Sequence, residues 1–436
     1  MATEAERYFD LSPTDRSMAI LDRSSPVTFH VIWDLVGPLD LAALARCWQG
    51  LATIHPILAC TADVAVDTRW HPAAQPLPFQ LVDAIDDRMY ELTAAEVGVR
   101  LDTGGPLVRL TALSRGATTR LVLGAHHAAF DGVASVVLLE DLRRVYVDYL
   151  GSGRLPPLPA DLSPRTVAGA AQHGGLSAGD RWRIAARSMD RWSRLPTSTH
   201  ADPAAGETDV ATGYEIIELG PALAALDERR RHNRWPVDAV LVGVLEAAWT
   251  DVFGPGGSGA GVWLVASDLR HGLAVTRGIG NLSGTEPVAI RRPGVRPVEK
   301  VIEQAAAEMA TWKSSHPGLG PELMARSWSW LPPAALNQGV EMMMRTGRRQ
   351  RYTRTLSNLG RLPSSLSDWG QARMEEIVFL GPMSKGPYNS FIAFAFGSSS
   401  RLTARVTPTG PTSAHVADLR AAIYQLCDAA PAQSGP

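Results

Sequence analysis

The chain has 436 residues, of which 45% are hydrophobic and 20% are charged, and its formal net charge at pH 7 is -2. This balance is typical of a soluble globular protein and excludes a strong overall field that would attract nucleic acid or an anionic membrane. No apolar run reaches the length of a membrane span, and residues 1–15 lack the apolar core of a signal peptide. The three cysteines, Cys47, Cys60 and Cys427, form no metal-ligand spacing and fit a reducing cytosol, so we expect a cytoplasmic protein.

The first part of the sequence predicts a mixture of strands and helices. Apolar and β-branched runs indicate strands, and apolar residues at helical spacing indicate helices. In chain order we expect a strand at 27–35, a helix at 41–53 capped by Asp40, strands at 107–113 and 120–125, and a helix at 133–150. A Ser-Arg-Gly turn between the last two strands predicts a β-hairpin.

The second part of the sequence repeats this mixture after a stretch rich in proline and glycine. We expect strands at 214–219, 261–266, 354–357, 376–380, 390–396 and 402–406, and helices at 221–231, 237–253 and 416–429. No glycine-rich phosphate loop follows an early strand, which argues against the nucleotide-binding folds. The fold class is therefore α/β (α+β).

Residues 126–132, His-His-Ala-Ala-Phe-Asp-Gly, lie between a predicted strand and a predicted helix. Because neighbouring residues on a strand point to opposite sides, one histidine can face a cleft while the other faces the scaffold. A neutral imidazole can take a proton from a nucleophile at cellular pH. Asp131 could fold back into a salt bridge, Gly132 suits a tight turn, and N–H groups at the helix start could stabilise an oxyanion.

Two other interpretations of this segment stay open. The histidines could be packed or solvated residues, with Asp131 acting only as a helix cap. A zinc site is less favoured, because no His-x-x-x-His or cysteine pair accompanies them.

The segment resembles the HHxxxDG signature of the condensation-domain superfamily. That group includes nonribosomal peptide condensation domains, mycobacterial polyketide-associated acyltransferases, wax ester synthases and, more distantly, chloramphenicol acetyltransferase. Shorter motifs match the superfamily in the same order along the chain: Gly37-Pro38-Leu39-Asp40, His55-Pro56-Ile57-Leu58, Leu101-Asp102, Gly105 to Arg109, Asp268-Leu269-Arg270, Gly280-Asn281 and Ser357-Asn358-Leu359-Gly360.

The resemblance implies two chloramphenicol-acetyltransferase-like subdomains that form a V-shaped pseudo-dimer with a central tunnel. We expect an N-terminal subdomain at 1–165, a crossover region at 166–210, a C-terminal subdomain at 211–430 and a disordered tail at 431–436. A monomer of this architecture can build its own site.

By the same resemblance, His127 is the catalytic general base. His126 and Asp131 are structural, and Gly132 keeps the loop tight. Arg270 is the first candidate partner for Asp131, and a second is Arg16.

Several further residues are candidates for substrate binding. Ser357, Asn358, Trp328 and Trp330 could line the tunnel, as could Trp312 and Met342 to Met344, although core packing is the alternative for the tryptophans. A basic cluster could hold a coenzyme A phosphate or an acidic carrier protein, or be a solvated face; it consists of Arg345, Arg348, Arg349, Arg351 and Arg354.

The resemblance implies an acyltransferase that works without a metal or a bound cofactor. The acyl donor would be a thioester of coenzyme A or of a phosphopantetheinyl carrier protein, and the acceptor a small-molecule hydroxyl or amine in natural-product biosynthesis. Residues 11–13 lack the Ala-Gln pair that usually follows in peptide synthetases, and no adenylation or carrier segment is attached, which favours a free-standing enzyme. The alternatives are a trans-acting condensation enzyme that forms an amide between carrier-bound substrates, a non-catalytic docking protein, and a metallohydrolase.

Overall fold

The computed structural model describes most of the chain. The described residues are 10–23, 26–64, 66–67, 69–73, 75–83, 88–156, 174–195, 214–254, 260–272, 277–291, 297–313, 316–326, 331–332, 334–335, 337–339, 342, 354–382, 389–405 and 412–428. Most of the predicted crossover region and the predicted tail therefore lie outside them.

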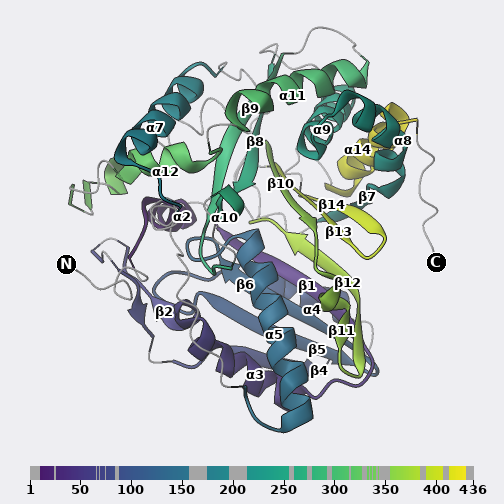
Figure 1. Cartoon of the computed structure of the whole chain (residues 1–436). Helices are drawn as coiled ribbons and strands as arrows, with labels where there is room; N and C mark the ends of the chain where they lie inside the picture. Colours follow the sequence, from purple (N-terminus) through teal and green to yellow (C-terminus); the bar gives the residue numbers. More distant parts are fainter. Residues whose placement is uncertain are drawn as a thin grey trace.

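The lower part of the molecule in Figure 1 is built on a six-stranded sheet. Its strands pair antiparallel except for β4 and β5, which are parallel. In spatial order they are β11 (Asp368–Trp369), β12 (Ala372–Leu380), β1 (Thr28–Val36), β6 (Thr118–His126), β5 (Val108–Arg115) and β4 (Phe79–Asp83). A separate two-stranded ribbon joins β2 (Cys60–Thr61) to β3 (His71–Pro72).

The upper part is built on a second six-stranded sheet. Here β10 runs parallel to both of its neighbours, and the other pairs are antiparallel. The order is β7 (Glu215–Glu218), β14 (Ser399–Arg405), β13 (Asn389–Phe396), β10 (Arg354–Arg361), β8 (Ala260–Asp268) and β9 (Ser283–Arg291).

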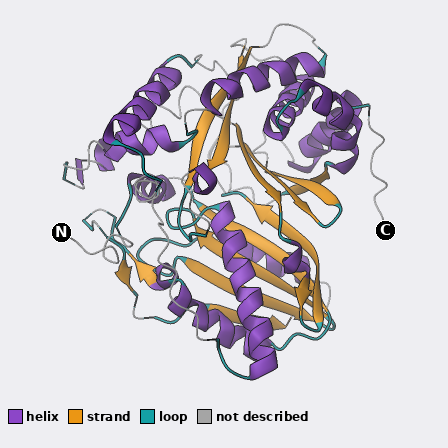
Figure 2. Cartoon of the chain, in the orientation of Figure 1, coloured by secondary structure: helices purple, strands orange, loops and turns teal. Residues whose placement is uncertain are grey.

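Helices pack along both sheets (Figure 2). In the first half they are α2 (Pro13–Asp22), α3 (Leu41–Ile54), α4 (Met89–Val97) and α5 (Gly132–Ser152), with the short helices η1 (Pro56–Ala59) and η3 (Ser364–Ser367) nearby. The second half contributes α7 (Ala178–Ser193), α8 (Gly220–Asn233), α9 (Val237–Phe253), α10 (Leu269–Gly272), α11 (Val298–Lys313), α12 (Leu319–Arg326) and α14 (Thr412–Leu426). The predicted α/β class is confirmed.

Successive side chains of β1 point to opposite faces of the first sheet, and both faces are covered by a hydrophobic cluster. Phe29, Val31 and Trp33 belong to the main core of the first half, to which α3 and α5 contribute. Ile32 belongs to a smaller cluster on the other face, together with Val97 of α4. The period of two that predicts a strand therefore also assigns each side chain to a core.

Strand β12 links the two halves, because it comes late in the sequence and yet pairs with β1 in the first sheet. Its Phe379 packs edge-to-face against Phe394 of β13 in the second sheet, with ring centroids 5.2 Å apart. The first sheet thus includes residues from the range 211–430, which the sequence assigns to the C-terminal subdomain.

None of the helices in the described ranges is both long and apolar enough to cross a membrane.

A buried carboxyl group joins α12 to α2. Glu322 is 3% exposed, and its Oε2 accepts hydrogen bonds from the Thr14 N–H at 2.8 Å and from the Thr14 hydroxyl. Its Oε1 is buried without a hydrogen-bond partner. Burial raises the pKa of Glu322 to about 7, although the bonds from Thr14 act in the opposite direction.

This pKa predicts a loss of stability as pH rises. Between pH 4.5, the ordinary pKa of this carboxyl group, and pH 7, the native state holds the proton and the unfolded state does not. Over that interval the Glu322 contribution falls by about 3 kcal/mol. In urea denaturation, the free energy of unfolding of Glu322→Gln should fall less between pH 5 and pH 8 than that of the wild type. The matched control is Glu303→Gln, at an exposed ion pair with Lys300; parallel profiles for Glu322→Gln and wild type would disprove the prediction.

Candidate active site

The loop that carries the two histidines connects β6 to α5. His126 is the last residue of β6, where it is the register partner of Thr28 in β1. The His127 N–H still donates to the Val27 carbonyl, at 3.3 Å. Helix α5 then begins at Gly132, with Asp131 as its N-cap residue. The chain is thus held by a sheet before the loop and by a capped helix after it.

His126 is completely buried. Its Nδ1 accepts a hydrogen bond from the Ala128 N–H at 3.1 Å, so the ring proton resides on Nε2. That nitrogen lies 3.9 Å from Oδ2 of Asp22. Burial by itself raises the pKa of Asp22, but His126, the Val27 N–H and Arg100 outweigh this effect and lower it.

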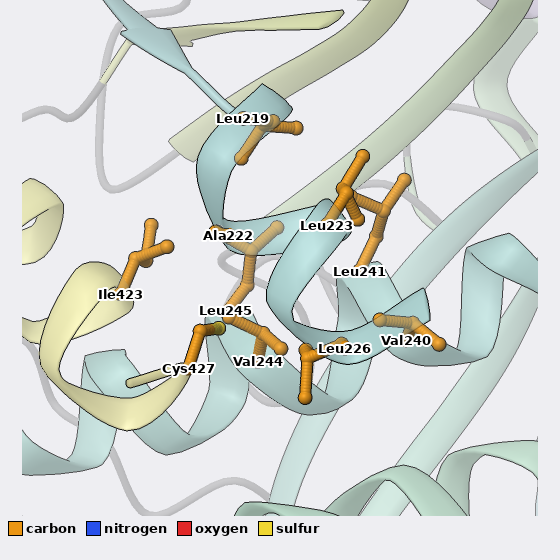
Figure 3. Close-up of a pocket in the computed structure, with 10 residues that line it drawn as sticks. All are labelled: Leu219, Ala222, Leu223, Leu226, Val240, Leu241, Val244, Leu245, Ile423 and Cys427. Atoms are coloured by element: carbon orange, nitrogen blue, oxygen red, sulfur yellow. The ribbon is translucent and has the colours of Figure 1, made fainter. Parts of the chain in front are cut away.

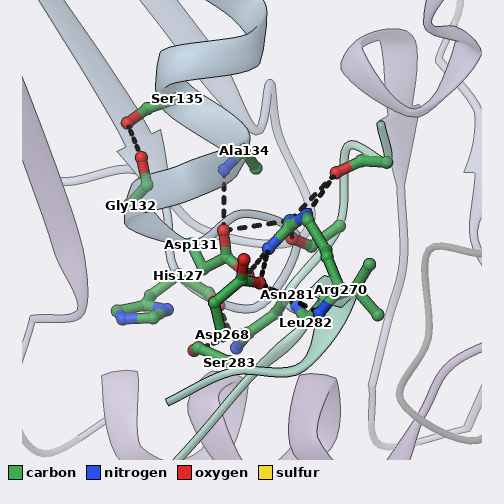
Figure 4. Close-up of polar contacts among 12 residues, drawn as sticks. His127, Asp131, Gly132, Ala134, Ser135, Asp268, Arg270, Asn281, Leu282 and Ser283 are labelled. Atoms are coloured by element: carbon green, nitrogen blue, oxygen red, sulfur yellow. Dashed lines mark hydrogen bonds and ion pairs between the residues drawn. The ribbon is translucent and has the colours of Figure 1, made fainter. Parts of the chain in front are cut away.

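His127 is half-buried, and its ring packs edge-on against Phe29 with centroids 5.4 Å apart. Its Nδ1 is buried and has no hydrogen-bond partner. Figure 4 shows the imidazole pointing away from the polar cluster around Asp131.

The surroundings of His127 favour the neutral imidazole. Burial lowers its pKa, as does the neighbouring His126, although the backbone groups of His127 and Phe130 and the charge of Asp131 act in the opposite direction. A neutral ring with an accessible nitrogen can accept a proton at pH 7.

Asp131 turns its carboxylate inward, where four donors surround it (Figure 4). Oδ1 accepts the Ala134 N–H at 2.7 Å, and Oδ2 accepts the Leu282 N–H at 2.7 Å. Two guanidinium nitrogens of Arg270 complete the set: Nη1 lies 3.0 Å from Oδ2, and Nη2 lies 3.1 Å from Oδ1. Since Asp131 belongs to the first half and Arg270 to the second, this bidentate pair ties the halves together beside the histidine loop.

Arg270 is held by the second half on its other sides. It also donates to Asp268 Oδ1 at 2.9 Å and to the carbonyls of Gly278 and Gly280. Arg16, the second candidate partner of Asp131, donates instead to the carbonyls of Val64 and Asp67. The partner of Asp131 is therefore Arg270.

The helix-start N–H groups that we expected to be available for an oxyanion are in part occupied. The Ala134 N–H bonds to the Asp131 carboxylate, and the Ser135 N–H donates to the Asp131 carbonyl at 3.1 Å. For these two groups the expectation was wrong, because the cap uses the first donor and the first intrahelical hydrogen bond uses the second.

Asn281 is a site residue that sequence reasoning noted only as part of a family motif. It is buried, and its Nδ2 donates to the His127 carbonyl at 2.8 Å. Ser283 donates to Asn281 Oδ1 at 2.8 Å and so fixes which way the amide points. The second half therefore holds the backbone of His127 as well as the side chain of Asp131.

A second ion-pair network, which sequence reasoning missed, links α5 to the other half. Asp141 is buried on α5, and its Oδ2 lies 2.8 Å from His55 Nε2. Its Oδ1 accepts from Arg277 of the second half at 2.7 Å and from Arg144 at 2.9 Å. The spacing of Asp141 and Arg144 on one helix gives a local signal for that pair alone, because His55 and Arg277 are far from Asp141 along the chain.

Gly132 is distinguished by a close contact rather than by an unusual turn. It is the first residue of α5 and does not have the positive φ that favours glycine. A Cβ at Gly132 would lie 2.8 Å from a Cδ atom of Leu359, so the motif at 357–360 packs directly against the histidine loop.

Of the other predicted site residues, some are described by the structure and others lie outside its described ranges. Asn358 donates to Asp238 Oδ1 of α9 at 2.7 Å, and Ser357 is half-buried on β10. Met342 is exposed, while Trp312 lies in α11. Outside the described residues lie Trp328, Trp330, Met343, Met344, Arg345, Arg348, Arg349 and Arg351.

Arg354 does not belong to an exposed basic face. It is buried, lies 2.6 Å from Glu246 Oε2, and stacks over Trp249 and Trp263. The expectation for Arg354 was wrong because the run of arginines gives no sign that this one begins a central strand.

An apolar pocket lies elsewhere, between α8, α9 and α14 (Figure 3). Burial raises the pKa of its one sulfur-bearing side chain, Cys427, to about 12, so this group stays a thiol at neutral pH. A pocket without polar groups to orient a ligand is part of the core. Its lining residues are Leu219, Ala222, Leu223, Leu226, Val240, Leu241, Val244, Leu245, Ile423 and Cys427.

Comparison with solved structures identifies the fold. The chain superposes on the starter condensation domain of rhizomide synthetase with a TM-score of 0.69, at 16% identity, covering 97% of this chain and 94% of that one. The first condensation domain of the calcium-dependent antibiotic synthetase gives 0.67 at 15% identity, covering 98% of both chains. The chain has the condensation-domain fold. Polyketide synthase associated protein 5 from Mycobacterium tuberculosis is also similar, with a TM-score of 0.66 at 16% identity and coverage of 96% of this chain and 98% of that one.

Comparison with curated sequences adds a group of acyltransferases, whereas no family model matches the chain. The phthiocerol/phthiodiolone dimycocerosyl transferase of Mycobacterium leprae is 28% identical over 49% of this chain and 52% of its own length. The protein of the same name from Mycobacterium ulcerans is 24% identical over 70% of this chain and 78% of its length. The chain thus spans about half the length of the first of these relatives. The resemblance to the condensation-domain superfamily is confirmed.

The packing of Gly132 gives a stability prediction. Gly132→Ala should lower the free energy of unfolding by no more than about 1 kcal/mol, because the new methyl group has to displace only the flexible end of the Leu359 side chain. Gly151→Ala is the matched control in the same helix, since nothing lies within 4 Å of the Cβ it would add, and it should raise stability by up to about 1 kcal/mol. Urea denaturation measures both. Equal effects of the two substitutions would contradict the packing argument.

Proposed function

We propose that the protein is an acyltransferase that moves an acyl group from a thioester to a hydroxyl or amine, with His127 as the general base. The observation that carries the proposal is the state of this ring. It is a half-buried ring whose surroundings favour the neutral imidazole, on a loop held by both halves of a condensation-domain fold. The names of the sequence relatives support the same reaction class.

The reaction needs only one proton-transfer group. Nε2 of His127 removes the proton of the acceptor O–H or N–H as the acceptor attacks the thioester carbonyl carbon. The tetrahedral intermediate then collapses, the C–S bond breaks, and the imidazolium returns its proton to the departing thiolate. Because both substrates are bound at once, no covalent acyl-enzyme is required.

The proposed donor is a thioester of coenzyme A or of a phosphopantetheinyl carrier protein. One structural neighbour was solved as a mutant in complex with C8-CoA and Leu-SNAC, and this supports testing both coenzyme A and simple thioester donors. The proposed context is natural-product biosynthesis, in line with the antibiotic and rhizomide synthetases among the neighbours. Ser357 stays a proposed tunnel residue, and Asn358 a proposed structural support for the strand that carries it.

The base assignment predicts a large and selective loss of activity. His127→Ala should reduce acyl transfer by about 10²–10⁴-fold. Intact-mass detection with a panel of acyl coenzyme A and acyl carrier-protein donors, against pooled amines and alcohols, measures product and identifies the donor class. His71→Ala, at an exposed histidine, is the control and should retain full activity. Undiminished transfer by His127→Ala would remove His127 as the base.

The lowered pKa of His127 predicts the pH profile. The base is active when deprotonated, so kcat/KM should fall only when the pH drops below 6.5, the ordinary pKa of histidine. Initial rates across an acidic pH series test this. A half-maximal rate at or above pH 6.5 would contradict the assignment.

A further inference from the structure

Arg405, the last residue of β14, is a buried cation with an unused hydrogen-bonding edge. It is 6% exposed, and its Nη1 donates to the Gly381 carbonyl at 2.6 Å. Its Nε and Nη2 are both buried and have no hydrogen-bond partner. Buried polar groups are normally satisfied, so two open donors on one side chain require an explanation.

No carboxylate neutralises this guanidinium among the described residues. Burial lowers the pKa of Arg405 to about 10, although the charge of Tyr214, among the described side chains, acts to raise it. Arg405 therefore stays charged at neutral pH. By contrast, Arg354 and Arg270, which are buried to a similar degree, are paired with Glu246 and Asp131. An unpaired buried charge is costly, and a protein normally supplies a counter-charge for it.

Two further side chains with an unsatisfied group belong to the same region, one from each half. The Gly381 carbonyl that binds Arg405 directly follows Leu380, the register partner of His30 in β1. His30 of β1 is 1% exposed and its Nδ1 has no partner. Burial, together with the charge of Arg405, lowers the pKa of His30 to about 3. The ring of His30 is therefore neutral at pH 7, and Arg405 is the cation of this pair. Thr403, on the same face of β14 as Arg405, has a buried hydroxyl without a partner.

The free edge of Arg405 has the geometry of an oxyanion site. Nε and Nη2 form one edge of the planar guanidinium group. From this edge they can donate two parallel hydrogen bonds to two oxygens of the same carboxylate or phosphate. We propose that Arg405 and His30 form a buried binding site for an oxyanion, a carboxylate or phosphate group carried by a small-molecule ligand. His30 contributes a neutral N–H donor, and the bound group supplies the missing counter-charge.

The site lies where the second sheet meets the first. His30 is two residues along β1 from Thr28, the register partner of His126. Its ring packs over Gly124 of β6, where a Cβ would lie 3.5 Å away. A ligand held there would be bound between the two halves, close to the end of the strand that leads into the histidine loop. The proposal does not depend on the catalytic role of His127.

Thermal unfolding of the full chain in different anions tests the site. Inorganic phosphate or succinate should raise the Tm of the wild type by about 2 °C over chloride at matched ionic strength. A larger effect of phosphate would indicate a phosphate ester as the natural group, and a larger effect of succinate would indicate a carboxylate. Arg405→Gln should lose the response. The control is Arg401→Gln on the same face of β14, where the arginine is already paired with Glu218 and Glu376, and it should keep the response.

A second variant keeps the test informative if Arg405→Gln fails to fold. His30→Glu places a carboxylate in the chain beside Arg405, so it should raise the Tm without added anion and abolish the response to phosphate and succinate. The proposal is overturned if neither anion stabilises the wild type beyond chloride, or if Arg405→Gln or His30→Glu responds as the wild type does.

Discussion

The structure around the histidine loop depends on one buried ion pair, between Asp131 and Arg270. The carboxylate caps α5, accepts a backbone N–H from the second half and binds two guanidinium nitrogens. Neither partner is solvated, since their side chains are 2% and 3% exposed. A buried charge is tolerated only when it is paired and hydrogen-bonded, so each half requires the other at this point. The pair therefore acts as a constraint on geometry more than as a source of stability.

Beside this ion pair, the two neighbouring histidines are held in different ways. His126 is fixed within the first half by the Ala128 N–H and Asp22, while the backbone of His127 is fixed from the second half by Asn281. The His127 ring is left with a buried Nδ1 and points away from the charged cluster. A ring held in this way would need little reorganisation to act as the base that we propose.

Patterns within short stretches of sequence predicted much of this structure, and contacts between distant stretches did not follow from them. Periodicity and turn residues located α9 and the β5–β6 hairpin, because local geometry decides those elements. The Asp131–Arg270 partnership followed from a family resemblance. The pairing of β12 with β1, the Asp141 network and the burial of Arg354 have no local signal, because each depends on packing across the chain. Gly132 belongs to the histidine motif, but its contact with Leu359 depends on how a distant part of the chain packs.

A double-mutant cycle on Asp131→Asn and Arg270→Met, measured by urea denaturation, tests the central claim most directly. Each single substitution leaves one buried polar or charged group without its partner and should lower the free energy of unfolding by about 3–5 kcal/mol. The double variant should be more stable than the sum of the two losses implies, with a coupling energy of about 2 kcal/mol or more. Additive losses, within about 0.5 kcal/mol, would contradict the claim that this pair holds the two halves together at the histidine loop.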